Sequence, residues 1–296
     1  MSAGELKLAV WAQDESSGFN TGLRRRDFSV SVDTQPAAVK SIIPPTGNLV
    51  VLVVADAVNN AEEFDAACRA FIESMEDFNK RELVAVLRAQ DGLRVIRDPS
   101  ANREATAKAL LDVPVSGIPG LLDSVEQVTA IANEMIAKSK VRVAILYITD
   151  GSIYQYRGDY TSPVINPSDS GDLSRRFRDR LIQERISRLT DSALASAAPQ
   201  FFLHLNERND NLNVVYQNGL LQLGKATGGD ALFARSLGDV PALVDRLVRL
   251  IRNHYLITVE PTGAPSGLRR LQVTAPAARP AISKQQVRIS GQSRAE

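Results

Sequence analysis

Cysteine and histidine are almost missing from this chain of 296 residues, which contains one cysteine and two histidines. A single cysteine, Cys68, excludes an internal disulfide and most cysteine-based metal sites. His204 and His254 leave little room for imidazole chemistry. The sequence also lacks a serine nucleophile elbow, a P-loop, and a glycine-rich phosphate turn after its first buried strand. We therefore expect that the protein is not an enzyme.

Long apolar runs and an excess of one charge are absent as well. The longest apolar run, residues 49–55, is far shorter than the ~20 residues that cross a bilayer, so we expect no membrane insertion. Lys and Arg number 35 against 34 Asp and Glu, a net charge of +1 that argues against nucleic-acid binding. Arginines gather in residues 173–189, but acidic residues interleave them, which is typical of a solvated helix face. Met1–Gly4 has neither the basic start nor the apolar stretch of a secretory leader.

The middle of the chain alternates strand-like and helix-like segments. Residues 49–55 and 141–148 are apolar on both faces, as in strands at the centre of a parallel sheet. Asp91-Gly92 separates two further strand-like segments and predicts a hairpin. This alternation predicts an α/β fold with a doubly wound, mostly parallel sheet. The expected helices cover residues 64–78, 103–111, 121–137, 173–189, 212–226 and 237–253, and the expected strands cover 49–55, 83–88, 93–97, 141–148, 201–205 and 231–234.

Both ends of the chain contain short strand-like segments that are too small to fold alone. We expect them to join in one small antiparallel β-domain into which the α/β unit is inserted, because chain ends commonly lie near each other. The strand-like segments are residues 6–12, 28–32, 255–260, 268–274 and 287–289. The expected divisions are an N-terminal β segment (1–45), the α/β domain (46–254), a C-terminal β segment (255–290) and a tail (291–296).

The carboxyl ends of the predicted strands should gather the residues that could bind a ligand. In open α/β sheets ligands bind beyond these ends. The segments placed there are residues 56–60, residues 116–120 and Thr149-Asp150-Gly151.

Several short motifs in a fixed order resemble those of the von Willebrand factor A domain, in particular bacterial proteins that carry β segments on both sides of it. They are Gly22-Leu23 with Asp27-Phe28-Ser29-Val30, Leu121-Leu122-Asp123-Ser124-Val125, Thr149-Asp150-Gly151, Gly228-Gly229, and Tyr255-Leu256-Ile257 followed by Pro261. The resemblance covers nearly the whole chain. It implies a Rossmann-like domain that binds proteins, in a bacterial protein located outside the cytoplasm, secreted or periplasmic.

The metal-ion-dependent adhesion site of that family is incomplete in this sequence. Asp56 and Asp150 stand at the positions of the two aspartates, but Val58 and Asn60 replace its two serines and Pro119 stands at the threonine position. Mg²⁺ prefers about six oxygen ligands, and Val58 supplies none from its side chain. We expect the site to be degenerate and without a cofactor. The alternative is a weakly held Mg²⁺ on Asp56, Asn60 and Asp150, which would make the chain a metal-dependent adhesion domain.

If no metal ion is bound, we expect Asp56, Asp150 and Asn60 to make contacts within the protein. An aspartate just past a strand, or Asn60 before the next helix, can cap a helix N-terminus. Two facing carboxylates repel each other, so an amide, a water or a basic side chain should separate them.

Residues 152–172 form the longest predicted loop, which overhangs the same edge of the sheet. Arg157-Gly158-Asp159 is a short adhesion-type tripeptide, a motif that is weak without its context. Tyrosine and arginine dominate protein–protein hot spots, which favours this loop as a partner surface. The expected partner-binding residues are Asn59, Asn60, Tyr154, Tyr156, Arg157 and Tyr160.

The function that these observations predict is a non-enzymatic protein-interaction module of the adhesion or scaffold type. Its partner is a protein that the sequence does not identify. Two alternatives stay open at this point. One is the metal-dependent adhesion domain, and the other is a hydrolase or nucleotide-binding enzyme on a doubly wound sheet.

Overall fold

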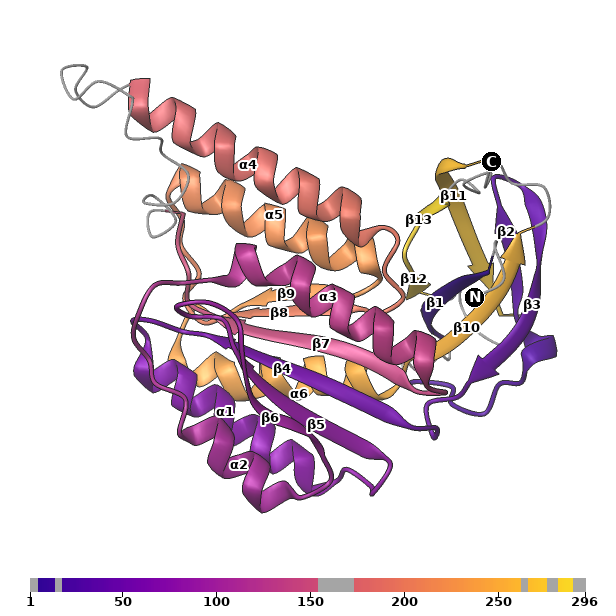
Figure 1. The fold of residues 1–296 in the computed structure, drawn as a ribbon, viewed down its shortest axis with the longest axis horizontal. Coiled ribbons are helices and arrows are strands. Elements are labelled where there is room, and N and C mark those ends of the chain that lie inside the picture. The colour runs from indigo at the N-terminus through magenta and orange to yellow at the C-terminus, as the bar shows by residue number, and fades with distance from the viewer. Residues whose placement is uncertain (1–4, 14–17, 154–172, 262–265, 276–281, 290–296) are drawn as a thin grey trace.

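The computed structural model describes residues 5–13, 18–153, 173–261, 266–275 and 282–289, which form one mixed sheet and one antiparallel sheet (Figure 1). The mixed sheet has the strand order β6-β5-β4-β7-β8-β9, and all its neighbours are parallel except β5 and β6. Its strands are β4 (Leu49–Asp56), β5 (Glu82–Arg88), β6 (Arg94–Ser100), β7 (Arg142–Thr149), β8 (Gln200–His204) and β9 (Asp230–Phe233).

Helices cover both faces of the mixed sheet (Figure 1). One face packs against α1 (Ala61–Glu76), α2 (Arg103–Leu111) and α6 (Val240–Arg252), and the other against α3 (Leu121–Lys138), α4 (Leu173–Ala193) and α5 (Asn211–Thr227). Strand β4 shows why: every residue of it is buried, and alternate side chains enter opposite cores. Val51 and Val53 contact the first core, and Val50 and Leu52 the second. The doubly wound α/β arrangement matches the sequence prediction.

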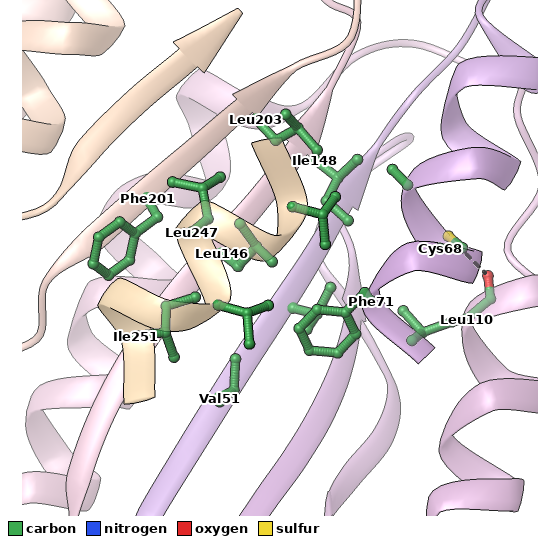
Figure 2. Close-up of a cluster of buried hydrophobic side chains, with 14 of the residues drawn as sticks. Val51, Cys68, Phe71, Leu110, Leu146, Ile148, Phe201, Leu203, Leu247 and Ile251 are labelled. Carbon is green, nitrogen blue, oxygen red and sulfur yellow. Dashed lines mark hydrogen bonds between the residues drawn. The ribbon is translucent and has the colours of Figure 1, made fainter. Parts of the chain in front are cut away.

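Cys68 lies inside the core between the sheet and α1 (Figure 2). Its Sγ is 3.9 Å from the carbonyl oxygen of Leu110, and its neighbours include Phe71. Burial raises the pKa of the thiol to about 12. The residue therefore acts as a small buried hydrophobic side chain.

The antiparallel sheet combines strands from both ends of the chain, in the order β12-β1-β10-β3-β2-β11-β13. Strand β1 pairs with β10, and β2 pairs with β11. A third core, which includes Val30 and Ile257, fills one face of this sheet. The strands are β1 (Leu6–Trp11), β2 (Ser29–Val32), β3 (Gln35–Ile43), β10 (Tyr255–Pro261), β11 (Gly267–Thr274), β12 (Ile282–Ser283) and β13 (Gln286–Ile289).

Strands β3 and β12 are missing from the sequence prediction. Strand β3 contains Pro36 and is mostly exposed, so it lacks the alternating apolar pattern of a half-buried strand. The turn before it uses Asp33 and Thr34 at positive φ (53° and 89°), where glycine or asparagine is the usual signal. The Asp33 carboxylate accepts the backbone N–H of Arg270 at 2.9 Å, which holds this turn from another strand.

Arg142, fully buried, joins the two segments at which the chain passes between the sheets. Its Nη1 donates to the carbonyls of Arg252 (2.9 Å) and His254 (3.0 Å) after α6. Its Nη2 donates to the carbonyls of Pro45 and Gly47 before β4. Burial, with the charge of Arg142, holds the pKa of His254 well below its ordinary value, so Arg142 supplies the positive charge at this helix end.

Candidate functional site

The carboxyl ends of the central strands β4 and β7 bring the two predicted aspartates to one edge of the sheet. Asp56 is the last residue of β4 and lies in register with Thr149 of β7, and Asp150 follows directly. Both carboxyl groups are fully buried. The edge therefore contains two buried acidic side chains on neighbouring strands, a costly arrangement unless each finds donors.

Backbone amides at the start of α1 hold the carboxylate of Asp150. Its Oδ1 accepts the N–H of Val58 at 2.9 Å, and its Oδ2 accepts those of Asn59 (2.6 Å) and Asn60 (2.7 Å). The helix dipole favours a negative charge near this end of α1. The prediction that Asn60 itself caps the helix is wrong, because its side chain makes no capping bond. Asp150, about ninety residues away, instead fixes the backbone that leads into the helix.

Asp56 is bound in the same manner at the start of a different helix. Its Oδ1 accepts the N–H of Gly120, just before α3, at 2.8 Å, and its Oδ2 accepts the hydroxyl of Thr149 at 3.1 Å. Burial raises the pKa of Asp56 to about 7, although these hydrogen bonds lower it, and the charge of Asp150 adds to the increase. Backbone amides therefore serve both carboxylates, each at a separate helix.

The loop before α3 contains Pro119, the residue at the position where the resemblance expects a threonine. Close packing and hydrogen bonds hold this loop in place. Gly120 leaves no room for a side chain, since a Cβ would lie 2.1 Å from the carbonyl oxygen of Ala89. The hairpin residue Asp91 exchanges hydrogen bonds with Ile118, at 2.9 Å through its carboxylate and 3.0 Å through its N–H. Pro119 is buried, while Ile118 is 60% exposed. A rigid loop thus presents an apolar side chain at this edge.

The residues at this edge do not fit a divalent cation. Val58 and Pro119 offer no side-chain oxygen, and protein donors already occupy the carboxylate oxygens of Asp56 and Asp150. Within the residues that the structure describes, no group of three or more His, Cys, Asp or Glu side chains is placed to hold a metal ion. Mg²⁺ would need about six oxygen ligands in octahedral order. The metal ligands that the sequence suggested are Asp56, Asn60 and Asp150. The carboxylates of Asp56 and Asp150 instead accept hydrogen bonds from other groups of the protein.

His204, at the end of β8, supports the same edge. Its Nε2 lies 2.7 Å from the carbonyl oxygen of Gly151, and its Nδ1 accepts the N–H of Asn206 at 3.3 Å. This pattern assigns the proton to Nε2 in a neutral ring. Desolvation lowers the pKa of His204, which keeps the ring neutral. The histidine therefore fixes the turn after Asp150.

The other predicted partner-binding residues are placed only in part. Asn59 is exposed and Asn60 is half-buried beside it. Tyr154, Tyr156, Arg157 and Tyr160 lie outside the described residues.

Sequence reasoning placed Thr149 and residues 116–120 at this edge and Asp91 in a hairpin, but it did not predict what Thr149, Asp91 and Ile118 do there. Thr149 binds Asp56 through its hydroxyl, Asp91 clamps the loop before α3, and Ile118 is the exposed apolar side chain on that loop. The hydroxyl directly before Asp150 is the signal that could have identified Thr149. Asp91 and Ile118 are far apart in the sequence, and no local pattern links them.

Asp56→Asn is expected to remove a pH-dependent loss of stability. The raised pKa of Asp56 means that between about pH 4 and 7 the folded chain retains a proton that the unfolded chain releases. The free energy of unfolding therefore falls as pH rises through this window, by at most ~1.4 kcal/mol per pH unit. Urea denaturation at pH 5 and pH 8 should show a smaller difference for the variant than for the natural chain. The matched control is Glu104→Gln, at an exposed residue of α2, which should keep the natural difference.

Comparison with known proteins rests on solved structures, since no protein-family model and no curated protein sequence matches the chain. The PilB minor pilin from Streptococcus sanguinis is similar over 70% of this chain, with a TM-score of 0.50 and 11% identity, and the match spans 61% of the pilin. A von Willebrand factor type A structure from Catenulispora acidiphila matches 97% of this chain and 73% of its own length, with a TM-score of 0.49 and 12% identity. The SpRpn10 VWA domain matches 68% of this chain and 95% of its own length, at 0.42 and 12%. Such identities show a shared fold alone, and the α/β part of the chain has a von Willebrand factor A-like fold.

Proposed function

We propose that this chain is a non-enzymatic protein-interaction module that binds a protein partner at the carboxyl edge of its mixed sheet without a divalent ion. The observation that carries the proposal is that backbone amides just before two helices bind the carboxylates of Asp56 and Asp150. In a metal-dependent adhesion site, hydroxyl ligands leave positive charge on the ion for a partner's carboxylate. Here the same edge holds Val58 and Pro119, so a partner has to be recognised by other contacts.

The proposed contact surface consists of Asn59, Ile118 and the segment of residues 152–172. Asn59 lies at the start of α1 with its backbone fixed by Asp150, and Ile118 is exposed on a clamped loop. Rigid exposed residues lose little conformational freedom on binding. Tyr154, Tyr156, Arg157 and Tyr160 join the surface on the strength of their sequence, because tyrosine and arginine are enriched in binding hot spots.

The location of the protein and its division into domains are part of the same proposal. No helix among the described residues is long and apolar enough to cross a membrane. We place the protein outside the cytoplasm of a bacterium, on the resemblance of its sequence motifs and the likeness of its fold to a pilin. We also propose the division into an inserted α/β domain (46–254) and a β-domain of both chain ends, which the pairing of β1 with β10 and of β2 with β11 supports.

Site-specific photo-cross-linking in the source cell tests the proposed edge. A photoreactive phenylalanine analogue at the position of Ile118 is expected to capture a partner that the same group at Lys140 does not capture. Lys140 is exposed and precedes β7, at the opposite edge of the sheet. Cross-linking at Ile118 should persist when EDTA is present. Equal capture from both positions, or capture that EDTA abolishes, would contradict the proposal.

A further inference from the structure

The strands β12 and β13 close the antiparallel sheet at a corner. They stand at the two ends of the strand order, β12 beside β1 and β13 beside β11, although only Lys284 and Gln285 separate them in the sequence. The carbonyl of Gln285 accepts the N–H of Leu271 in β11 at 2.8 Å. The corner segment, residues 282–289, therefore joins the two edges of this sheet.

The side chain of Lys284 ties the corner segment to the helices of the mixed sheet. Its Nζ donates to the carbonyls of Leu194 (2.8 Å) and Ser196 (2.7 Å), just after α4, and the residue is 2% exposed. Figure 1 shows the carboxyl-terminal end of α4 directed toward β12 and β13. A second contact, between Arg288 and Asp191 at 3.6 Å, lies at the surface. The buried contact of the corner with α4 therefore depends on one amino group.

The surroundings of this amino group suit its neutral form. An ammonium group has three N–H donors, whereas a neutral amine has two. Two carbonyl oxygens accept from Nζ, and within the described part of the chain no carboxylate forms an ion pair with Lys284. Removal from water disfavours the charged form of a lysine, and burial lowers the pKa of Lys284 from its ordinary value of 10.5 to about 7.

Burial, rather than a neighbouring charge, is the cause of this lowered pKa. The elements packed against the corner segment carry one acidic and several basic side chains. They are Asp191 at the end of α4, Lys225 of α5, Lys7 of β1, Arg269 and Arg270 of β11, and Arg288 of β13. The carboxylate of Asp191 is 64% exposed and lies beside Arg288, so it does not stabilise a buried ammonium group.

We propose that Lys284 is a pH-sensitive latch, which holds the corner segment against α4 as a neutral amine and lets the corner open locally when it is protonated. In the open form Lys284 meets water and regains its ordinary pKa. Between about pH 7 and 10.5 the open form then binds a proton that the closed form lacks, so the closed form gains stability as the pH rises. Below about pH 7 both forms are protonated and the dependence ends.

Opening of the corner would leave the outer edges of β1 and β11 without these partners. Unpaired strand edges can pair with other strands, so the latch controls whether this sheet is closed. The latch is independent of the edge at Asp56 and Asp150, and either proposal can fail without the other.

Hydrogen exchange of the Leu271 amide, followed by NMR, measures the opening, because this N–H donates to the corner at Gln285. Its protection factor is expected to fall about twenty-fold from pH 8.5 to pH 6.5 and to change little from pH 6.5 to pH 5.5. The Ile145 amide, which donates to Pro199 in the mixed sheet, should stay at least about ten-fold better protected throughout. Equal protection of the two amides would mean that the corner opens only on global unfolding, and would overturn the proposal.

Two substitutions of Lys284 separate its charge from its packing. Lys284→Met cannot be protonated, so the protection of Leu271 should become independent of pH over this range. Lys284→Arg stays charged at every pH and should leave Leu271 poorly protected throughout. Lys225→Met, at an exposed lysine of α5, is the matched control and should keep the pH dependence of the natural chain.

Circular dichroism confirms that each variant is folded. A natural chain in which the protection of Leu271 does not change with pH would contradict the latch. So would a pH dependence that persists in Lys284→Met, or that is present in Lys284→Arg to the same extent as in the natural chain.

Discussion

Arg142→Met is expected to lower the free energy of unfolding by about 3–5 kcal/mol, because several buried carbonyl oxygens lose their donor at once and each unsatisfied acceptor costs about 1–3 kcal/mol. The guanidinium group is fully buried and donates to four backbone carbonyls, those of Pro45, Gly47, Arg252 and His254. Burial lowers its pKa to about 10, so it stays charged at neutral pH. Methionine keeps an unbranched apolar stem but leaves these carbonyls without the guanidinium donors.

Urea denaturation of the Arg142 variants provides the measurement. Arg142→Lys should recover part of the loss, because an ammonium group reaches fewer of the four carbonyls than the planar guanidinium group. Arg69→Met is the matched control, since Arg69 is an exposed arginine of α1 paired with Asp65 and should matter little. If Arg142→Met and Arg69→Met lower the free energy of unfolding by the same amount, contacts other than those of Arg142 hold together the two segments that pass between the sheets.

The elements that the sequence predicted well are those whose signal is local. Helix α2 begins at Arg103 and ends at Leu111, as expected, because Asn102 caps it by accepting the N–H of Ala105. The hairpin at Asp91-Gly92 forms with both residues at positive φ. Strand β4 has apolar residues on both faces and forms the centre of the mixed sheet.

Other features depend on partners that are remote in the sequence. Arg142 is an arginine inside an apolar strand, and only the folded chain shows that two crossing segments converge on it. Lys284 is similar: its amino group is buried and donates to the carbonyls of Leu194 (2.8 Å) and Ser196 (2.7 Å), just after α4. No periodicity or motif predicts such contacts, because each joins residues that are at least 88 positions apart in the sequence.

The candidate site shows the same limit. The placement of Asp56 and Asp150 at one edge followed from the positions of two buried strands, since parallel strands end together. The sequence also shows Val58 and Pro119 at the positions where the resemblance expects hydroxyl side chains. The donors that bind the carboxylate of Asp150 were not visible in the sequence, because these amides lie just before α1, some ninety residues earlier in the chain.

Asp150→Ala is expected to lower the free energy of unfolding by about 2–4 kcal/mol, because three amides at the start of α1 lose their acceptor at once. Asp150→Asn should lose less, since one oxygen remains. Asp210→Ala is the matched control: Asp210 caps α5 locally at an exposed position, so its loss should be near the ~1 kcal/mol of an ordinary cap. Urea denaturation ranks the three variants, and hydrogen exchange should locate the loss at the first turn of α1.

Melting temperatures measured with and without Mg²⁺ and Mn²⁺ distinguish two roles of Asp150, hydrogen bonding to the amides before α1 and ligation of a metal ion. A ligand that binds the folded chain alone raises the melting temperature in proportion to the logarithm of its concentration. If amides hold Asp150 in place of an ion, neither cation should raise the melting temperature of the natural chain, and Asp150→Ala should be destabilised equally in EDTA and in saturating Mn²⁺. If instead Mn²⁺ stabilises the natural chain and Asp150→Ala loses only that increment, the carboxylate is a metal ligand and the absence of hydroxyls at Val58 and Pro119 has been compensated elsewhere at this edge.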